Sequence, residues 1–307
     1  MPLFNSILDV IGNTPMVRLN RIVPSNGGAV YAKLEQFNPS GSVKARAAYS
    51  MITSAEDAGV LKPGMVLVEA TSGNLGLAVS MVAAVRGYRV VLFVEENDRI
   101  DAFMKCARSL GAEMVFTESF EMAVRMAAQF AKDDPKVFVL SQFTNPANPR
   151  VHAETTACEI VRDAGPRLRA FVASFGSGGT FTGVSSYLKK HHPDVEVVLA
   201  EPEGAPLFSG GRMGCSKIHG VGPTFKPAIM EGVQIDTIIP VSLEAADTFR
   251  ARLAREEGLF VGPSSGAIAS VAATVAARYK PEDIIVAVFP DDGNRYINFA
   301  GIPEVQS

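Results

Sequence analysis

Apolar residues recur along the chain in two alternating patterns. Short runs rich in Val, Ile and Ala, such as residues 88–94 and 284–289, end at proline or polar positions, as buried strands do. Longer segments, such as 75–86 and 243–257, have the length and spacing of helices. Because the two kinds of segment alternate with short connections, the pattern predicts an α/β fold in which helices cover parallel sheets.

The alternation divides into two blocks. The first is expected to contain helices at 47–58, 75–86, 102–110 and 120–131 and strands at 65–69, 88–94, 113–116 and 137–140. The second is expected to contain helices at 154–164, 181–190, 243–257 and 267–279 and strands at 170–174, 195–201 and 284–289. Residues 29–34 alternate like a short strand. The segment 202–231 is rich in glycine and proline and lacks periodicity, and a loop of that length in a compact domain is usually functional.

Composition bounds the class of protein. The 307 residues are 47% apolar and 20% charged, enough for two ordinary domains with substantial cores. The net charge of −3 gives no electrostatic reason to expect a nucleic-acid or membrane partner, and no apolar stretch reaches membrane-spanning length. The first residues lack the basic and apolar regions of a secretory signal, so we expect a cytoplasmic protein. Cys106, Cys158 and Cys215 lie far apart without metal-ligand spacing, so we expect reduced thiols and no metal site.

One lysine stands where a turn gives way to a helix. Residues 38–44 (Asn-Pro-Ser-Gly-Ser-Val-Lys) follow the expected strand 29–34 and end it with proline and glycine. Ser42 is a predicted N-cap, which places Lys44 at the positive end of the helix dipole, where its charged form is disfavoured. A readily neutralised lysine is a nucleophile toward a carbonyl, although most lysines in a first helical turn are only solvated surface charges.

Two polar loops each connect a strand to a helix. Residues 71–76 (Thr-Ser-Gly-Asn-Leu-Gly) place hydroxyls and backbone N–H groups at a helix N-terminus, which suits a carboxylate but also describes an ordinary capped helix. Residues 176–180 (Gly-Ser-Gly-Gly-Thr) have the layout of a phosphate-binding loop. A dinucleotide fold is the competing interpretation, because Glu201 follows the next strand like a ribose-binding acid. That fingerprint needs a third glycine where Phe181 stands, so a monophosphate fits the loop better.

A third turn, residues 262–267 (Gly-Pro-Ser-Ser-Gly-Ala), is by itself only a serine-capped helix start. Taken together, Lys44, the two loops and Ser264 supply what pyridoxal phosphate chemistry requires. The lysine amine can bond the cofactor aldehyde, and one loop can hold the phosphate. The serine can meet the pyridine nitrogen, and the other loop can bind the carboxylate of an amino acid.

The chain resembles the cysteine synthase family of pyridoxal-phosphate enzymes, which includes the O-acetylserine sulfhydrylases and the cystathionine β-synthase cores. The resemblance runs from residues 11–15 (Ile-Gly-Asn-Thr-Pro) to 292–296 (Asp-Gly-Asn-Arg-Tyr), with the motifs in the family's order and spacing. It implies that Lys44 forms the Schiff base, that Asn74 bonds the ring hydroxyl and that Ser264 meets the pyridine nitrogen. It also implies a phosphate site at Gly176, Ser177, Gly178, Gly179 and Thr180, and a substrate site at Thr71, Ser72, Gly73, Leu75, Gln142 and Gly220.

The resemblance further implies a fold, a domain organisation and a reaction. The fold would be the two-domain fold type II of pyridoxal-phosphate enzymes, like the tryptophan synthase β subunit, with a smaller mobile domain at 40–150 and a larger one formed by 1–39 and 151–307. The reaction would be β-replacement on O-acetylserine or a related O-activated serine, through an aminoacrylate intermediate. Sulfide would be the nucleophile, giving cysteine. Homocysteine or an amine is the alternative nucleophile, and a catalytically idle homologue with a binding or regulatory role is the alternative of a different class. The resemblance also implies a homodimer.

Three segments depart from the family's pattern. Ala45 stands where an aspartate usually follows the lysine, and Ala153 replaces an aromatic residue in the segment 152–156 (His-Ala-Glu-Thr-Thr). Residues 97–103 replace a family loop that closes over substrate, and are one residue longer and altered in charge. These changes leave the identity of the nucleophile open, whereas residues 220–222 (Gly-Val-Gly) resemble the sulfide-using enzymes.

Overall fold

The computed structural model describes residues 3–96, 101–211, 214 and 216–297. Residues 97–100 of the altered loop and the expected thiol of Cys215 therefore lie outside the described residues. The chain divides into two units, one formed by Met1–Ile11 and Asn38–Asn148 and the other by Gly12–Phe37 and Pro149–Ser307. This division differs from the expected one at the N-terminus, where residues 3–11 group with the unit that contains Asn38–Asn148. Among the helices of the described residues, none is long and apolar enough to cross a membrane.

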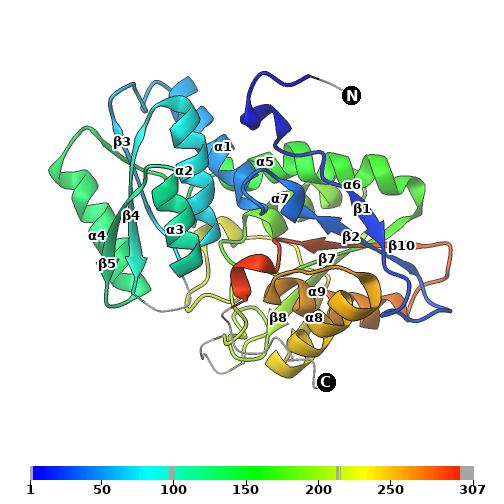
Figure 1. Ribbon diagram of the computed structural model, residues 1–307. Coiled ribbons are helices and arrows are strands. Elements are labelled where there is room, and N and C mark those ends of the chain that lie inside the picture. The colour runs from blue at the N-terminus through cyan, green and yellow to red at the C-terminus, as the bar shows by residue number, and fades with distance from the viewer. Residues whose placement is uncertain (1–2, 97–100, 212–213, 215, 298–307) are drawn as a thin grey trace. The chain divides into compact units, whose positions relative to one another are not determined.

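The first unit is built on a parallel sheet with the strand order β5-β4-β3-β6 (Figure 1). Its strands are β3 (Val66–Ala70), β4 (Arg89–Glu95), β5 (Glu113–Thr117) and β6 (Val137–Val139), and its helices are α1 (Lys44–Asp57), α2 (Asn74–Arg86), α3 (Asp101–Ser109) and α4 (Phe120–Asp133). Ala123 and Ala127 of α4 pack against Val91 and its face of the sheet. Helix α2 covers the opposite face, where Gly76 lies against Leu92.

The second unit is built on a sheet with the order β1-β2-β10-β7-β8-β9, in which only the β1–β2 pair is antiparallel. Its strands are β1 (Met16–Arg18), β2 (Ala29–Leu34), β7 (Leu168–Ala173), β8 (Glu196–Pro202), β9 (Thr237–Val241) and β10 (Ile284–Phe289), and its main helices are α6 (Ala157–Ala164), α7 (Gly179–His191), α8 (Leu243–Glu257) and α9 (Pro263–Ala276). Helices α6 and α7 cover one face and α8 and α9 the other (Figure 1).

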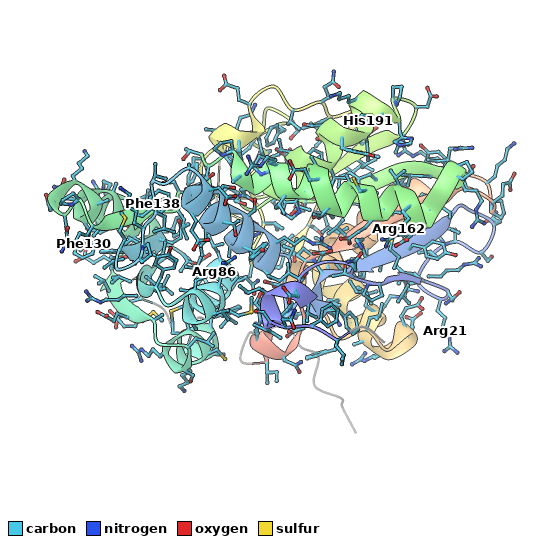
Figure 2. The ribbon with its side chains drawn as sticks, turned by 90° about the horizontal axis from the view of Figure 1, so that it is seen from above. Arg21, Arg86, Phe130, Phe138, Arg162 and His191 are labelled. Atoms are coloured by element: carbon cyan, nitrogen blue, oxygen red, sulfur yellow. The ribbon has the colours of Figure 1, made fainter. Side chains whose placement is uncertain are left out.

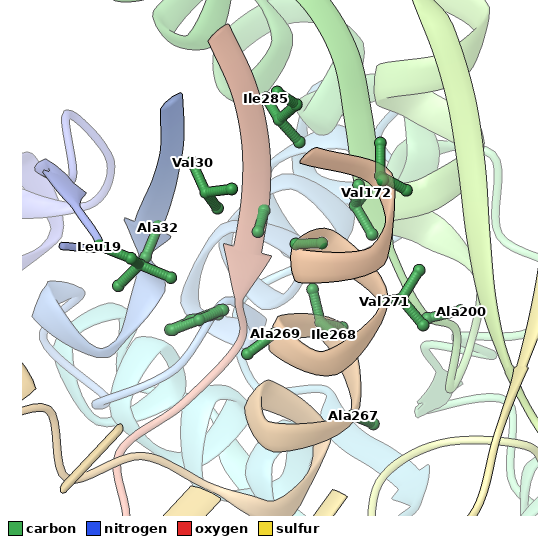
Figure 3. Packing of buried hydrophobic residues seen from close by; sticks show 14 of the residues in the cluster. Leu19, Val30, Ala32, Val172, Ala200, Ala267, Ile268, Ala269, Val271 and Ile285 are labelled. Carbon is green, nitrogen blue, oxygen red and sulfur yellow. The ribbon is translucent and has the colours of Figure 1, made fainter. Parts of the chain in front are cut away.

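The central strand of this sheet is buried on both faces. Every residue of β10 is buried, because alternate side chains point into two separate hydrophobic clusters. Ile285 joins Val30 and Val172 in the cluster that α9 covers with Ile268 and Val271 (Figure 3). Continuous apolar runs such as 284–289 are what such doubly covered strands require.

Helix starts differ from the predicted ones. Helix α1 begins at Lys44 with Val43 as its N-cap residue, so the prediction of Ser42 as N-cap was wrong by one position. Val43 already has helical backbone angles, and the Ser42 hydroxyl instead accepts the N–H of Lys44 at 3.3 Å. Helix α9 begins at Pro263 rather than at 267, because proline is tolerated in a first helical turn, where its missing N–H is not needed.

The helix predicted at 154–164 is part of a longer composite. It starts with α5 (Ala147–Val151), which contains Pro149 in its first turn, and continues through a π-helical turn at His152–Thr156 into α6. The strand β9 was not predicted. Its Pro240 argues against a central strand, but β9 lies at the edge of the sheet, where a missing N–H is tolerated.

The second unit encloses a buried charge pair. The ammonium of Lys33, fully buried on β2, lies 2.7 Å from a carboxylate oxygen of Glu159 on α6 and donates to the carbonyl of Thr14 at 2.7 Å. The other carboxylate oxygen of Glu159 accepts the N–H of Asn13 at 3.0 Å. Arg162, labelled in Figure 2, donates to the side chain of Asn13 at 3.2 Å. These contacts tie the turn at 12–15 to α6.

We expect Glu159→Gln to lower the free energy of unfolding by about 3–5 kcal/mol, because it leaves the Lys33 ammonium buried without its counter-charge. The double variant Lys33→Met/Glu159→Gln should recover most of this loss, since neither charge then remains. Denaturant unfolding of the wild type, the single variant and the double variant measures the difference. Equal losses in the single and double variants would contradict the assignment.

Candidate functional site

The predicted site residues of the first unit lie at the carboxyl edge of its sheet. Residues 71–74 follow β3, and Gln142 follows β6, which pairs with β3 in parallel. Because parallel neighbours end at the same edge, the two loops are adjacent there. The side-chain amide of Gln142 donates to the carbonyl of Ala70 at 3.3 Å, which joins the end of β3 to the second loop.

Thr71 organises the loop between β3 and α2. Its buried hydroxyl oxygen accepts the N–H of Gly73 at 3.2 Å and that of Gly76 at 3.1 Å. Gly73 has φ +151°, and a Cβ there would lie 3.2 Å from the ring of Phe103, so the position requires glycine. Asn74 then begins α2. The N-cap residue of α2 is Gly73, which has no side chain to cap the helix, so the loop presents the backbone of Ser72 to Leu75 at a helix N-terminus that suits a carboxylate.

Lys44 is the first residue of α1 and is half-buried. Helix α1 packs on α2, the helix that begins at Asn74. The hydroxyl of Ser50 on α1 donates to the carbonyl of Ala147, which holds the chain that follows Gln142. Ala45, where the family usually has aspartate, is fully buried, so a carboxylate at this position would carry a desolvation cost.

A buried carboxylate that the sequence analysis missed supports the Gln142 loop. Glu69, near the end of β3, accepts the N–H of Ser141 at 2.7 Å with one oxygen and that of Gln142 at 3.5 Å with the other. Ser141 has φ +58°, a left-handed conformation that costs energy for a residue other than glycine. The signal in the sequence that could have identified Glu69 is the presence of a charged residue within the otherwise apolar strand 66–70.

Burial raises the pKa of Glu69 from 4.5 to about 8, and this effect outweighs the hydrogen bonds from Gln142 and Ser141, which lower the pKa. The neutral carboxyl is therefore favoured in the folded protein at acidic pH. The contribution of the neutral Glu69 carboxyl to the free energy of unfolding is complete below the pKa that Glu69 has in the unfolded chain. This contribution is lost as the pH rises through the folded pKa of about 8.

Glu69→Gln cannot ionise, so it should remove this pH dependence. We expect the free energy of unfolding of the wild type, relative to that of Glu69→Gln, to fall by about 5 kcal/mol between acidic pH and pH above the raised pKa. Urea unfolding of both proteins at a series of pH values measures this. Parallel pH profiles for the two proteins would show that Glu69 does not titrate in this way.

The glycine loop of the second unit opens α7. Helix α7 begins at Gly179, and Gly178, with φ +91°, stands at its N-cap, where no described side chain caps the helix. A Cβ on Gly178 would lie 2.3 Å from Met230, and one on Gly176 would lie 2.7 Å from the carbonyl oxygen of Gly220. Both positions therefore require glycine, and the backbone N–H groups of the loop form a cradle for an anion.

Two more predicted residues share this edge of the sheet. The N–H of Gly222 donates to the carbonyl of Phe175 at 2.9 Å, which fixes Gly220 beside the glycine loop. Ser264 is buried in the first turn of α9, the helix that precedes β10. Since α9 covers β10 and β7 and runs back to the start of β10, its N-terminus lies at the carboxyl edge, where the glycine loop follows β7.

Glu201 has a structural role that separates this site from a dinucleotide site. Its buried carboxylate accepts the N–H of Phe208 at 2.7 Å and the N–H of Ser209 at 3.1 Å. Glu201 thus anchors the irregular segment 202–231 instead of facing a ribose. The ring of Phe208 packs against Phe175 with ring centres 5.1 Å apart, so the segment is held against the start of the glycine loop.

The groups present fit pyridoxal phosphate. The second unit offers a glycine cradle at an uncapped helix N-terminus for the phosphate and a neutral hydroxyl, that of Ser264, for the pyridine nitrogen. The first unit offers the amine of Lys44 for the aldehyde and the loops at Thr71 and Gln142 for a carboxylate. The described part of the chain contains no group of three or more potential metal ligands.

Comparisons with known proteins agree with this chemistry. The sequence matches the family described as pyridoxal-phosphate dependent enzyme over residues 7–291. It is 46% identical to the "Probable cysteine synthase" of Bacillus subtilis, over 94% of this chain and 95% of that protein. It is 42% identical to the O-ureido-L-serine synthase of Streptomyces lavendulae, over 99% of this chain and 95% of that protein. A crystal structure of an O-ureido-L-serine synthase superimposes with a TM-score of 0.92, over 99% of this chain and 97% of that one. The O-acetylserine dependent cystathionine β-synthase of Helicobacter pylori is 33% identical, with a TM-score of 0.92 over 99% of this chain and 100% of that one.

Proposed function

Because the chain belongs to the pyridoxal-phosphate-dependent enzymes, and among them to the cysteine synthase family, we propose that it converts O-acetyl-L-serine and sulfide into L-cysteine and acetate. The observation that carries this proposal is the set of donors that each unit offers. It comprises the lysine at the start of α1, the two loops of the first unit, and the glycine loop and Ser264 of the second. The name of the Bacillus subtilis relative supports sulfide as the nucleophile.

The proposed reaction exchanges one bond at Cβ. The Cβ–O bond of O-acetyl-L-serine breaks and acetate leaves with the electron pair, after which the sulfur of sulfide forms a bond to Cβ. Bound pyridoxal phosphate supplies an electron sink for the negative charge that develops at Cα. The Nζ of Lys44 would hold the cofactor by its aldehyde, and with substrate bound it would remove the Cα proton and later return a proton there.

The other residues bind and orient. The loop at Thr71, Ser72 and Gly73 and the amide of Gln142 would hold the substrate carboxylate, since they supply hydroxyl and N–H donors at a helix N-terminus. Ser264 would meet the pyridine nitrogen with a neutral hydroxyl. Unlike an aspartate, this hydroxyl does not force the nitrogen to carry a proton, which favours departure of the β-leaving group over reprotonation at Cα.

The nucleophile is the point on which the relatives differ. A protein named O-ureido-L-serine synthase would need hydroxyurea in place of sulfide if it works by the same replacement, and a cystathionine β-synthase would need homocysteine. Ala45 and Ala153 are departures that this chain shows from the family pattern. A larger nucleophile is therefore the second candidate, with the same first substrate.

Product analysis with O-acetyl-L-serine and three separate nucleophiles, sulfide, homocysteine and hydroxyurea, tests the proposal. We expect L-cysteine to form with the highest kcat/KM and Lys44→Ala to form no product with any nucleophile. A kcat/KM for homocysteine or hydroxyurea that exceeds the value for sulfide by orders of magnitude would replace sulfide as the nucleophile. A wild-type protein that binds the cofactor but forms no product with any of them would indicate the idle homologue.

We also propose a homodimer. Leu3, Phe4 and Ile7 of the first unit have exposed fractions of 99%, 54% and 48%, an unusual exposure for neighbouring large apolar side chains. A second copy of the chain that covers them would remove this surface from water. We expect light scattering to give the mass of a dimer for the wild type and the mass of a monomer for Leu3→Ser/Phe4→Ser/Ile7→Ser. The control is Val60→Ser, which changes another exposed apolar residue of the same unit and should remain a dimer. A monomeric wild type would exclude the dimer.

We place the protein in the cytoplasm. The two described cysteines, Cys106 and Cys158, are exposed free thiols. Exposed thiols persist in a reducing compartment and are oxidised in secreted proteins. This supports the location that the sequence analysis expects.

A further inference from the structure

A buried histidine lies behind the glycine loop of the second unit. His152, which is only 1% exposed, begins the π-helical turn His152–Thr156. Its Nε2 lies 3.3 Å from the hydroxyl oxygen of Thr180, and its Nδ1 lies 2.9 Å from the hydroxyl oxygen of Thr156. Turns of this kind are rare and occur frequently at functional sites. The proposed reaction gives His152 no role, although it belongs to a segment that the sequence analysis singled out.

Close packing of α7 against the turn at His152 fixes the distance between the side chains of His152 and Thr180. A Cβ on Gly183 would lie 2.1 Å from the carbonyl oxygen of Pro149 and 2.7 Å from the Cβ of His152, so only glycine lets α7 approach this closely. Thr180 precedes Gly183 by three residues and therefore shares its face of α7. Thr156 is fully buried, which keeps the other end of the imidazole in place.

A threonine hydroxyl has one proton to give, and this limits the possible arrangements. If Thr180 donated its proton to Nε2 of His152, its oxygen would face a bound phosphate with lone pairs only. If Nε2–H donates to Thr180 instead, the proton of the Thr180 hydroxyl is left for the phosphate. Thr156 can complete this arrangement by donating its own hydroxyl proton to Nδ1.

We propose that His152 is a positioning residue that directs the hydroxyl proton of Thr180 toward the cofactor phosphate. The hydrogen bonds then run in one direction, from Thr156 to His152, from His152 to Thr180 and from Thr180 to the phosphate, and bonds aligned in this way strengthen one another. This inference rests on the proposed role of residues 176–180 as the phosphate loop. His152 itself does not touch the cofactor.

Cofactor affinity, measured with and without the phosphate group, tests the proposal. Full-length protein stripped of cofactor is titrated with pyridoxal 5′-phosphate and, separately, with pyridoxal, and binding is followed by visible absorbance. The variants are Thr180→Val, His152→Leu, the double variant, and His152→Gln, whose amide can place an N–H near the position of Nε2. Pyridoxal is the matched control, because it lacks only the phosphate.

We expect His152→Leu and Thr180→Val each to weaken binding of pyridoxal 5′-phosphate about tenfold, the effect of one lost hydrogen bond to a charged group. Binding of pyridoxal should not change, which also shows that the variants are folded. The double variant should be no weaker than Thr180→Val alone, because His152 acts only through Thr180. His152→Gln should recover part of the affinity.

Three outcomes would overturn the proposal, and they separate it from the proposed function. Equal losses for pyridoxal and its phosphate in His152→Leu would show a general structural role. In a second outcome, Thr180→Val weakens binding of pyridoxal 5′-phosphate alone, but the losses of the two single variants add in the double variant. That result would support the phosphate loop and refute only the action of His152 through Thr180. An unchanged affinity in Thr180→Val would refute the phosphate role of Thr180 and with it this inference.

Discussion

Backbone N–H groups at helix starts are the feature on which the candidate site depends. Helices α2, α7 and α9 each begin at the carboxyl edge of their sheet, and the N-cap residue of each is a glycine, which has no side chain to cap the helix. A helix start of this kind attracts an anion through its N–H groups and its dipole. Glycine stands near these starts where another residue would not fit, because φ is positive at Gly73 and Gly178 and because a Cβ would collide at Gly176 and Gly178. In the proposed site, anion binding would therefore be a property of the backbone, and the side chains would add the chemistry.

Buried polar groups hold the loops that carry this chemistry. In the first unit, the two carboxyl oxygens of Glu69 accept the backbone N–H groups of Ser141 and Gln142. In the second unit, Glu201 does the same for residues 208 and 209, and His152 lies behind Thr180. Burying such groups is costly unless their hydrogen bonds are made, so each one fixes the loop that satisfies it. These residues touch no substrate in the proposed reaction, yet the geometry of the site depends on them.

Local patterns predicted much of the fold. Helix α8 and strand β10 have the predicted bounds, because an amphipathic or continuous apolar run ends where the element ends. The sequence also predicted the turns at 71–76 and 176–180, which lead from β3 to α2 and from β7 to α7, since glycine, serine and threonine mark them directly. Strand β9 escaped prediction because the tolerance of Pro240 depends on its place at the sheet edge.

The remaining features depend on contacts between distant segments. Glu69 reads as an isolated charge in a strand until β3 pairs with β6 and brings Ser141 to it. The close packing of α7 against the π-helical turn at His152 passes through Gly183, and no local pattern encodes this contact. The roles of Asn74 and Gly220 came from family resemblance and stay predictions.

Reduction of the purified holoprotein with borohydride, followed by peptide mapping, tests the central claim most directly. Borohydride fixes the cofactor covalently to the lysine that holds it. We expect a single modified peptide with the pyridoxyl group on Lys44. Modification of any other lysine, or a cofactor-loaded protein that yields no modified peptide, would refute the role of Lys44.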